Sequence, residues 1–545
     1  MSAPKIPLFL ILVAVALSAR ADQHSGQQFG SVHFPVSCSP AAQETFTSGV
    51  ALLHSFAFES AEADFRKALE QDPHCAMAHW GIARSYWRWD VPDAPQRKDG
   101  WKEISAGKAL DPPTERERDY LDALGRFYDH PGADNDKRED AYLKAMEQLC
   151  RRYPDDHEAA AFYAWALIAT DDKSHKKRKQ AAAILEPLFV VEPNHPGMAH
   201  YLIHAYDVSG MAEKGLPAAR RYASIAPAAP HALHMPSHIF ARLGLWQEDI
   251  DSNLASIAAS RNAASVGLAD EGHQYHAMEF LVYAYLQCGR EDQARALIEE
   301  VKKLPEMKDM YGTDADPRAS ARVSYPATVA LELHDWKAAA TLEPVPGASL
   351  SDSSIIHLAR ALGAAHSGAL QQAREEVAEI EKLRAALEQK GEHDLAKEVD
   401  RDWRRATAWV DHAEGRNSAA LKALQEIAKH EGGAFAAEGE LPAREMLGDM
   451  LMEMNEPAKA LAEYEANLKY NPNRFGSLYG AARAAELAKQ PAKAESYYRQ
   501  LVKICAGGNS QRPELVQAKR FSSIDIKEGL GPMGSARSAR RSHLT

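Results

Sequence analysis

The side chains best suited to chemistry in this sequence are histidines that recur at matched places between residues 196 and 289. Three segments of helical character in this range each end at a glycine, a residue that commonly terminates helices: Gly210, Gly244 and Gly289. His200 and His234 both lie ten residues before their glycine, and His204 and His238 both lie six residues before it. Because residues four apart share one face of a helix, each pair of histidines is a candidate chelating pair.

The third segment carries different side chains at the same two places. Glu279 lies ten residues before the glycine and Tyr283 lies six residues before it, while His231 and His276 share a place thirteen residues before theirs. If the three helices lie side by side, these groups converge on one surface. We therefore expect one polar site in the middle of the chain.

A transition-metal site is the most specific hypothesis for this pattern. Neutral imidazoles bind copper, zinc or iron, and the expected ligands are five histidines: His200, His204, His234, His238 and His276. This set exceeds what a closed tetrahedral site needs, which favours a dinuclear centre or a site with an open position. The sequence contains no H-E-x-x-H, so it lacks the zinc-protease motif.

Neighbouring side chains suggest how such a metal could act in catalysis. In that case Glu279 would be a general base, Tyr283 a hydrogen-bond donor and Arg242 a clamp for an anion. Two alternatives stay open: a protein that carries metal without catalysis, and histidines that only pack or form hydrogen bonds.

Composition and the N-terminus restrict the class of protein. The 545 residues carry a net charge of -12, which gives no support to nucleic-acid binding. Residues 1–21 resemble a signal peptide, with an apolar run too short to span a membrane, so we expect an exported, periplasmic or secreted protein without a transmembrane anchor. Export permits disulfides, and Cys38 and Cys75, which flank the first helical hairpin, are the pair we expect to bond.

Small and aromatic residues recur with the spacing of a 34-residue helical hairpin. The first copy consists of five positions: Gly49, Ala61, Phe65, Ala68 and Pro73. A second clear copy lies near the C-terminus: Gly448, Leu451, Ala460, Tyr464 and Pro472. This sequence pattern resembles the tetratricopeptide repeat, and the opening of the chain also looks like that of exported bacterial repeat proteins of unsettled function.

The resemblance implies an all-α, right-handed superhelical solenoid of helix–turn–helix repeats. We expect a polar lead over 22–40, one array over 41–341, a second array over 354–505, and a disordered tail over 506–545.

In that family the first helix of each hairpin lines a concave groove, so the matched histidines, with Glu279 and Tyr283, should face it. Asp207 and Arg242 should also reach this groove. Pro236 either tilts His234 away or sets the angle at which the two pairs of histidines meet. The resemblance also supports a different function, in which the groove binds a peptide, a protein or a small polar ligand without chemistry.

Overall fold

Helix pairs follow one another along almost the whole chain. The structure is a computed structural model that describes residues 28–88, 94–129, 134–172, 174–307, 316–431 and 441–528. Within these ranges the regular structure is helical, with one short 3₁₀ segment and no strand. The expected all-α solenoid is therefore confirmed.

The helices of the first part of the chain lead up to the histidine-rich segment. They are α2 (Pro40–His54), α3 (Phe58–Gln71), α4 (Ala76–Tyr86), α5 (Ala94–Ala109), α6 (Glu115–Tyr128), α7 (Asn135–Arg152), α8 (His157–Ala169) and α9 (Lys176–Val191). The middle helices are α10 (Pro196–Tyr206), α11 (Ala212–Ile225), α12 (Pro230–His234), α13 (Pro236–Leu243), α14 (Trp246–Asn262), α15 (His273–Gln287), α16 (Glu291–Val301), α17 (Pro317–Glu332) and α18 (Trp336–Ala340).

The remaining helices form the C-terminal part of the solenoid. They are α19 (Leu350–His366), α20 (Leu370–Lys390), α21 (His393–Ala413), α22 (Asn417–His430), α23 (Ala443–Glu453), α24 (Pro457–Leu468), α25 (Phe475–Leu487), α26 (Pro491–Ile504) and α27 (Pro513–Glu528).

The small and aromatic positions of the repeat pack as their spacing predicts. A Cβ atom added to Gly49 would lie 2.7 Å from the Phe65 ring, and one added to Gly81 would lie 2.5 Å from it. The Phe65 ring is buried, so α2, α3 and α4 approach closely only because these two positions carry no side chain. Tyr464 has the same role in the second clear copy, between Gly448 and Gly480.

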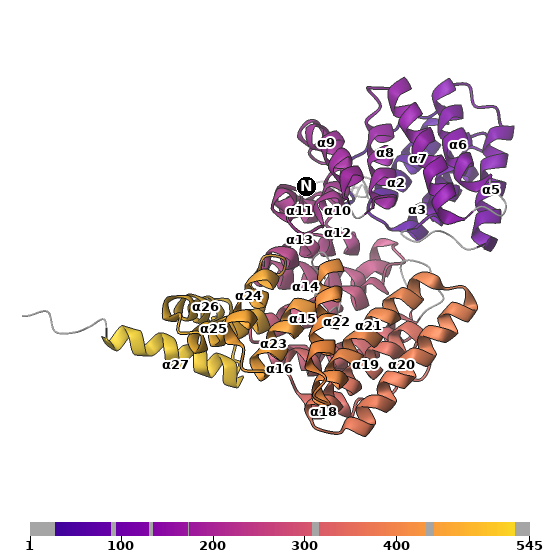
Figure 1. Ribbon diagram of the computed structural model, residues 1–545. Helices are drawn as coiled ribbons and strands as arrows, with labels where there is room; N and C mark the ends of the chain where they lie inside the picture. The colour runs from indigo at the N-terminus through magenta and orange to yellow at the C-terminus, as the bar shows by residue number, and fades with distance from the viewer. Residues whose placement is uncertain are drawn as a thin grey trace, which may run out of the picture.

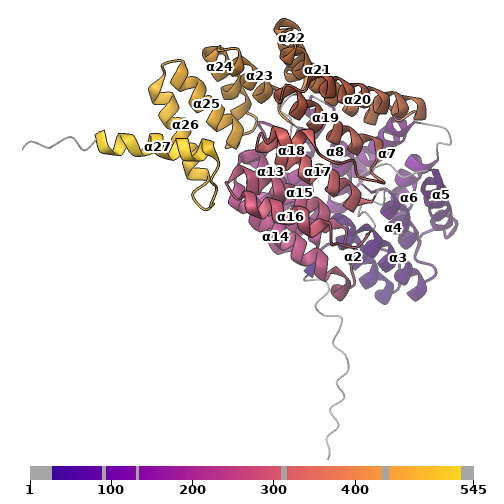
Figure 2. The same ribbon diagram turned by 90° about the horizontal axis from the view of Figure 1, so that it is seen from below.

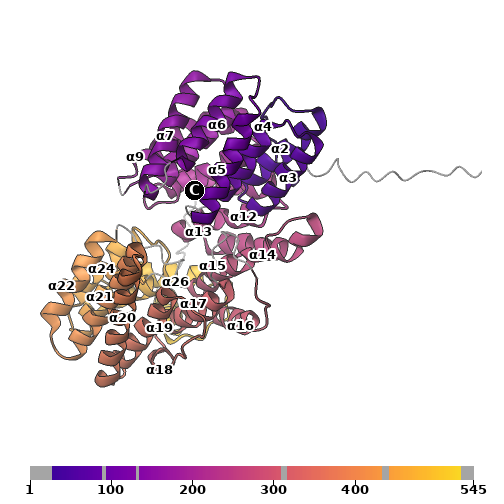
Figure 3. The same cartoon turned by 90° about the vertical axis from the view of Figure 1, so that its right-hand side faces the viewer.

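The solenoid forms two lobes that meet at the histidine-rich helices. Figures 1 and 3 show α2 to α9 in one lobe, α14 to α27 in the other, and α12 and α13 between them. The N-terminal lobe turns back onto α10: the backbone N–H of Ser31 donates to Asn194 O at 3.0 Å, and α2 contacts α10 directly. The turn between α2 and α3 therefore lies against α10.

The C-terminal helices also turn back, onto the middle of the chain (Figure 2). Trp246 Nε1 donates to Asn473 O at 2.9 Å, and Asn473 Nδ2 donates to Gly244 O at 3.1 Å. The buried Arg474 guanidinium lies 2.7 Å from Glu332 and 2.7 Å from Glu445. These contacts join the C-terminal helices to the middle of the chain.

Several expectations about the termini can now be compared with the structure. Cys38 and Cys75 form a disulfide, as predicted. The expectation of a disordered tail from residue 506 is wrong for its first part: α27 packs on α26 and buries Leu515 and Ala518, two apolar residues one helical turn apart. The proposed signal peptide and residues 529–545 lie outside the described residues. Among the helices described, none combines the length and apolarity needed to cross a bilayer.

Candidate metal centre

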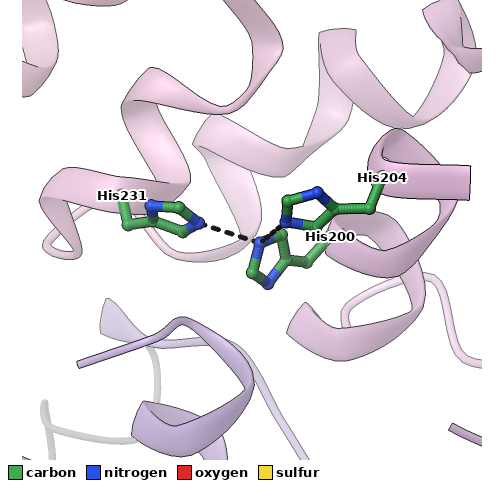
Figure 4. Close-up of side chains that lie close together, drawn as sticks. All are labelled: His200, His204 and His231. Atoms are coloured by element: carbon green, nitrogen blue, oxygen red, sulfur yellow. Dashed lines mark hydrogen bonds between the residues drawn. The ribbon is translucent and has the colours of Figure 1, made fainter. Parts of the chain in front are cut away.

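The first histidine group consists of His200 and His204 on α10 and His231 on α12. His200 Nε2 lies 3.0 Å from His204 Nε2 and 2.9 Å from His231 Nε2. Figure 4 shows both neighbouring rings directing a nitrogen at the same nitrogen of His200. The predicted pair on α10 thus faces inward as a pair, and α12 supplies a third imidazole.

The surroundings of the first histidine group fix the ring of His200 and exclude water. His200 Nδ1 donates to the backbone carbonyl of His54 at 2.6 Å, so Nε2 carries the lone pair. The Phe56 ring lies 4.4 Å from the His200 ring and 5.0 Å from the His231 ring, and the Tyr222 ring stacks on His200 at 5.2 Å. Burial lowers the pKa of His200 to about 3, which keeps this imidazole neutral at physiological pH.

The second histidine group consists of His234, His238 and His276, from α12, α13 and α15. His234 Nε2 lies 3.1 Å from His238 Nε2, and the His276 ring centroid lies 4.5 Å from that of His234. The helix is interrupted at Met235 because Pro236 has no N–H, yet the predicted pair still meets across this break. Pro236 therefore does not tilt His234 away.

Outer partners also orient the second histidine group. His234 Nδ1 donates to Asn253 Oδ1 at 2.7 Å, and His238 Nδ1 donates to Asp207 Oδ2 at 2.9 Å. A carboxylate oxygen can only accept, so His238 Nε2 bears the lone pair. Burial would raise the pKa of Asp207, but the ion pair with Arg242 and the bond to His238 outweigh burial and hold that pKa well below its usual value. This arrangement is the carboxylate–histidine pair that commonly supports metal ligands.

His273 on α15 lies between the two groups. Its buried ring is 5.4 Å from the ring of His231 and 5.2 Å from that of His234. The rings of His231 and His234, which belong to different groups, are 6.3 Å apart. Seven histidines thus form one continuous array, and burial lowers the pKa of His273 well below its usual value.

The structure places the three side chains predicted to assist catalysis in different surroundings. Glu279 Oε2 lies 3.6 Å from His276 Nδ1, and Glu279 also lines a polar cavity of about 300 Å³. Arg242 is bonded to Asp207, beside the second histidine group. Tyr283 is buried, and its hydroxyl oxygen accepts a bond of 2.8 Å from Arg474. The return of the C-terminal helices covers Tyr283 and draws it into that ion-pair network.

Most outer partners of the site are not visible in the sequence pattern. The pattern pairs His231 with His276 by position without indicating His231 as a ligand, and it gives no indication of His273. A third buried cluster also escaped notice: Glu158 accepts from His54 Nε2 at 2.8 Å and from His195 Nε2 at 3.0 Å. The one available signal for these residues was the density of histidines, because their partners come from turns far away in the sequence.

The spacing of the ligand nitrogens is compatible with metal ligation. With metal–nitrogen bonds of about 2.0–2.1 Å, ligand nitrogens lie about 2.9 Å apart at a right angle and about 3.3 Å apart at the tetrahedral angle. The nitrogens within each helical pair lie at 3.0 and 3.1 Å, inside this range. Each group brings three imidazole nitrogens close enough together to bind one ion.

Comparison with known proteins gives one family and several distant structures. A family model described as tetratricopeptide repeat matches residues 57–88 and 445–509. No curated protein matches the chain.

Solved structures that resemble this chain include the human IFIT1 dimer with m7Gppp-AAAA, at 13% identity and a TM-score of 0.34, covering 84% of this chain and 95% of that one. Naa15/Naa10 bound to HypK-THB gives 11% identity and a TM-score of 0.24, covering 90% and 93% respectively. The APC/C hetero-tetramer Cut9–Hcn1 gives 13% identity and a TM-score of 0.26, covering 89% and 96%.

Proposed function

We propose that this chain, a tetratricopeptide-repeat protein, is a metal-binding protein whose two histidine groups hold copper or zinc. In this proposal the path of the solenoid places the helices that carry the ligands around the metal: α10, α12, α13 and α15. The proposal concerns binding. It adds chemistry to a scaffold whose repeats are otherwise typical of protein and peptide binding.

The crowding around His200 Nε2 is the observation that carries the proposal. This nitrogen has a single lone pair, because Nδ1 donates its proton to the His54 carbonyl. Two further imidazole nitrogens lie within 3.0 Å of it. One lone pair satisfies at most one good hydrogen bond, whereas a metal ion accepts all three nitrogens at once. Among the residues that the structure describes, His231 Nδ1 has no hydrogen-bond partner, so hydrogen bonding alone does not account for this ring either.

The ligand set favours copper or zinc over iron. All six members of the two groups are imidazoles, which suit copper and zinc, whereas carboxylate-bridged iron sites need several glutamates on facing helices. The nearest carboxylates, Asp207 and Glu279, contact histidines, so they act as outer partners of the ligands.

Export is the second part of the proposal. The apolar segment at the N-terminus has the pattern of a signal peptide. The disulfide between Cys38 and Cys75 supports an oxidising compartment, because disulfides are rare in the reducing cytosol. We therefore infer a periplasmic or secreted metal-binding protein.

Elemental analysis of the protein purified without a polyhistidine tag or chelator tests the proposal. The wild type should contain copper or zinc, and the His204→Ala/His238→Ala double variant should lose it. His79→Ala is the matched control, because His79 pairs with Glu103 outside both groups. Absence of metal from the wild type, even after reconstitution with copper, zinc and ferrous iron, would overturn the proposal.

The C-terminal lobe supports a second function, the binding of a peptide or protein. A cavity of about 260 Å³ lies on its inner side, where the Trp336 ring stacks on His366 at 3.9 Å and the Arg512 guanidinium lies 3.6 Å from the centre of the Phe475 ring. Flat rings beside charged groups are typical of peptide-binding grooves. A peptide library screened against the wild type and Trp336→Ala tests this function: peptides that bind both equally do not use this cavity.

A further inference from the structure

The two histidine groups differ in the electrical character of their surroundings. In the first histidine group, the described contacts of His200 and His231 are with a backbone carbonyl, with aromatic rings and with other histidines. The charge of Asp207 reaches His204, but Arg178, whose Nη1 donates to the His204 carbonyl, opposes it. An ion in this group would therefore lie beside aromatic rings and a backbone carbonyl, with two opposed charges near His204.

Carboxylates contact the second histidine group directly. Asp207 accepts from His238 at 2.9 Å, and Glu279 lies 3.6 Å from His276. The group is also closer to solvent, since the side chain of His276 is 25% exposed. The charge of Asp207 is balanced by Arg242, so an ion here would have the Glu279 carboxylate behind one ligand and room for a solvent ligand.

This contrast selects ions by charge. The cost of transferring an ion out of water rises with the square of its charge, so a divalent ion loses about four times as much as a monovalent one in the same surroundings. Neutral, enclosed surroundings therefore favour a monovalent ion, whereas nearby carboxylates offset the greater cost of a divalent one. Copper is the metal with affinity for imidazole that is stable with a single charge.

Coordination number also favours a monovalent ion in the first histidine group. Zinc prefers four ligands, and a site with three protein ligands completes its shell with water. The three rings of the first histidine group are enclosed by Phe56 and Tyr222, and their nitrogens meet with His200 in the middle. Three nitrogens in an enclosed site satisfy cuprous ion, which accepts low coordination numbers. The second histidine group has three nitrogens and access to water.

Repulsion between the two ions favours unequal charges as well. The rings of His231 and His234, which belong to different groups, lie 6.3 Å apart. The two ions would therefore be close to each other, and the solvent would screen their repulsion poorly. The repulsion is proportional to the product of the charges. One monovalent and one divalent ion repel each other half as strongly as two divalent ions.

We propose that the first histidine group is a cuprous site and that the second histidine group binds a divalent ion, Zn²⁺ or Cu²⁺. This inference rests on the proposed metal-binding function and assigns a different ion to each half of it. The chain then holds two different ions at once, each in the surroundings that match its charge.

Two competition titrations of the metal-free protein test this assignment. Cuprous ion is titrated anaerobically against bicinchoninate, and Zn²⁺ is titrated against a chromogenic chelator. Each is done with the wild type, His204→Ala, His238→Ala and the control His79→Ala. Thermal melts of each metal-free variant establish that it is folded.

The expected result is a crossed pattern. The wild type binds one tight Cu⁺ and one tight Zn²⁺. His204→Ala weakens Cu⁺ binding by more than about 100-fold, since losing a direct ligand costs more than losing an outer partner, and leaves Zn²⁺ binding unchanged. His238→Ala does the reverse, and His79→Ala resembles the wild type.

Two tight Zn²⁺ ions in the wild type, or loss of Zn²⁺ in His204→Ala, would overturn the assignment while leaving the metal-binding function intact. The first of these outcomes needs no variant, so a misfolded variant cannot hide it. Absence of binding by either ion would instead overturn the proposed function itself.

Discussion

Removing the charge of Asp207 tests how the second histidine group is built. Asp207 follows α10, accepts from His238 Nδ1 at 2.9 Å and forms an ion pair with Arg242. The Asp207→Asn substitution keeps the shape of the side chain but replaces one carboxylate oxygen with an NH₂ group, which removes the negative charge. The direct ligand His238 stays in place, so the change acts only through its outer partner.

The expected effect is a weaker divalent site. Loss of an outer-shell partner of a ligating histidine typically costs about 10- to 100-fold in metal affinity, which corresponds to about 1.4–2.7 kcal/mol. Asp207 should lie toward the upper end of this range, because it is buried and also balances Arg242. The affinity of the first histidine group for Cu⁺ should fall less, since the charge of Asp207 reaches His204 but Arg178 opposes it there.

The assay is Zn²⁺ competition with a chromogenic chelator, with a thermal melt of each metal-free protein to separate binding from folding. Glu103→Gln is the matched control, because Glu103 holds His79 in a similar carboxylate–histidine pair at 2.6 Å, outside both groups. An Asp207→Asn protein that is folded and binds Zn²⁺ as tightly as Glu103→Gln would refute the reasoning. Equal loss of both ions would show that Asp207 supports the whole array rather than one group.

Three further predictions concern stability. Gly480→Ala should destabilise the protein by about 1–3 kcal/mol, measured by urea unfolding, because the new Cβ would lie 2.4 Å from the Tyr464 ring; an unchanged midpoint would contradict the close packing. Burial raises the pKa of Asp270 to about 7, so the folded protein favours the protonated carboxyl. The resulting stabilisation is fully present below the unfolded pKa of 3.8 and is lost as the pH rises through 7. Asp270→Asn should therefore stabilise the protein at pH 8, by at most about 4 kcal/mol, and should have little effect at pH 4; a gain independent of pH would contradict this. The Cys38–Cys75 disulfide joins residues 37 positions apart and so restricts the unfolded chain. Its removal should lower the free energy of unfolding by about 4 kcal/mol. A Cys38→Ser/Cys75→Ser variant that melts at the wild-type temperature would contradict this prediction.

The parts of the fold that depend on local spacing could be predicted from the sequence. Phe65 and Tyr464 each fill the space left by two glycines, and this requirement is visible as a 34-residue pattern of small and aromatic residues. The two pairs of histidines could be predicted for the same reason, since residues four apart meet on any helix. Their nitrogens lie 3.0 and 3.1 Å apart.

The parts of the site that depend on the path of the solenoid could not be predicted. The His54 carbonyl reaches His200 across 146 positions of sequence, and Phe56 lies against the same ring, because the N-terminal lobe turns back onto α10. Tyr283 has the predicted position on its helix, but Arg474, which precedes α25 and lies 191 positions away in sequence, donates to its hydroxyl oxygen and covers it. The small rotations between successive hairpins accumulate along the solenoid and determine which distant segments meet. The sequence of one hairpin does not reveal this accumulated rotation.

X-ray absorption spectroscopy of the metal-loaded wild type at the copper and zinc edges would identify the atoms that bind each metal. We expect a first shell of imidazole nitrogens at about 2.0–2.1 Å around the zinc, with the outer-shell scattering of histidine rings, and a three-nitrogen shell around the copper. A first shell of sulfur, or of oxygen without imidazole scattering, would contradict the claim that the two histidine groups hold the metal.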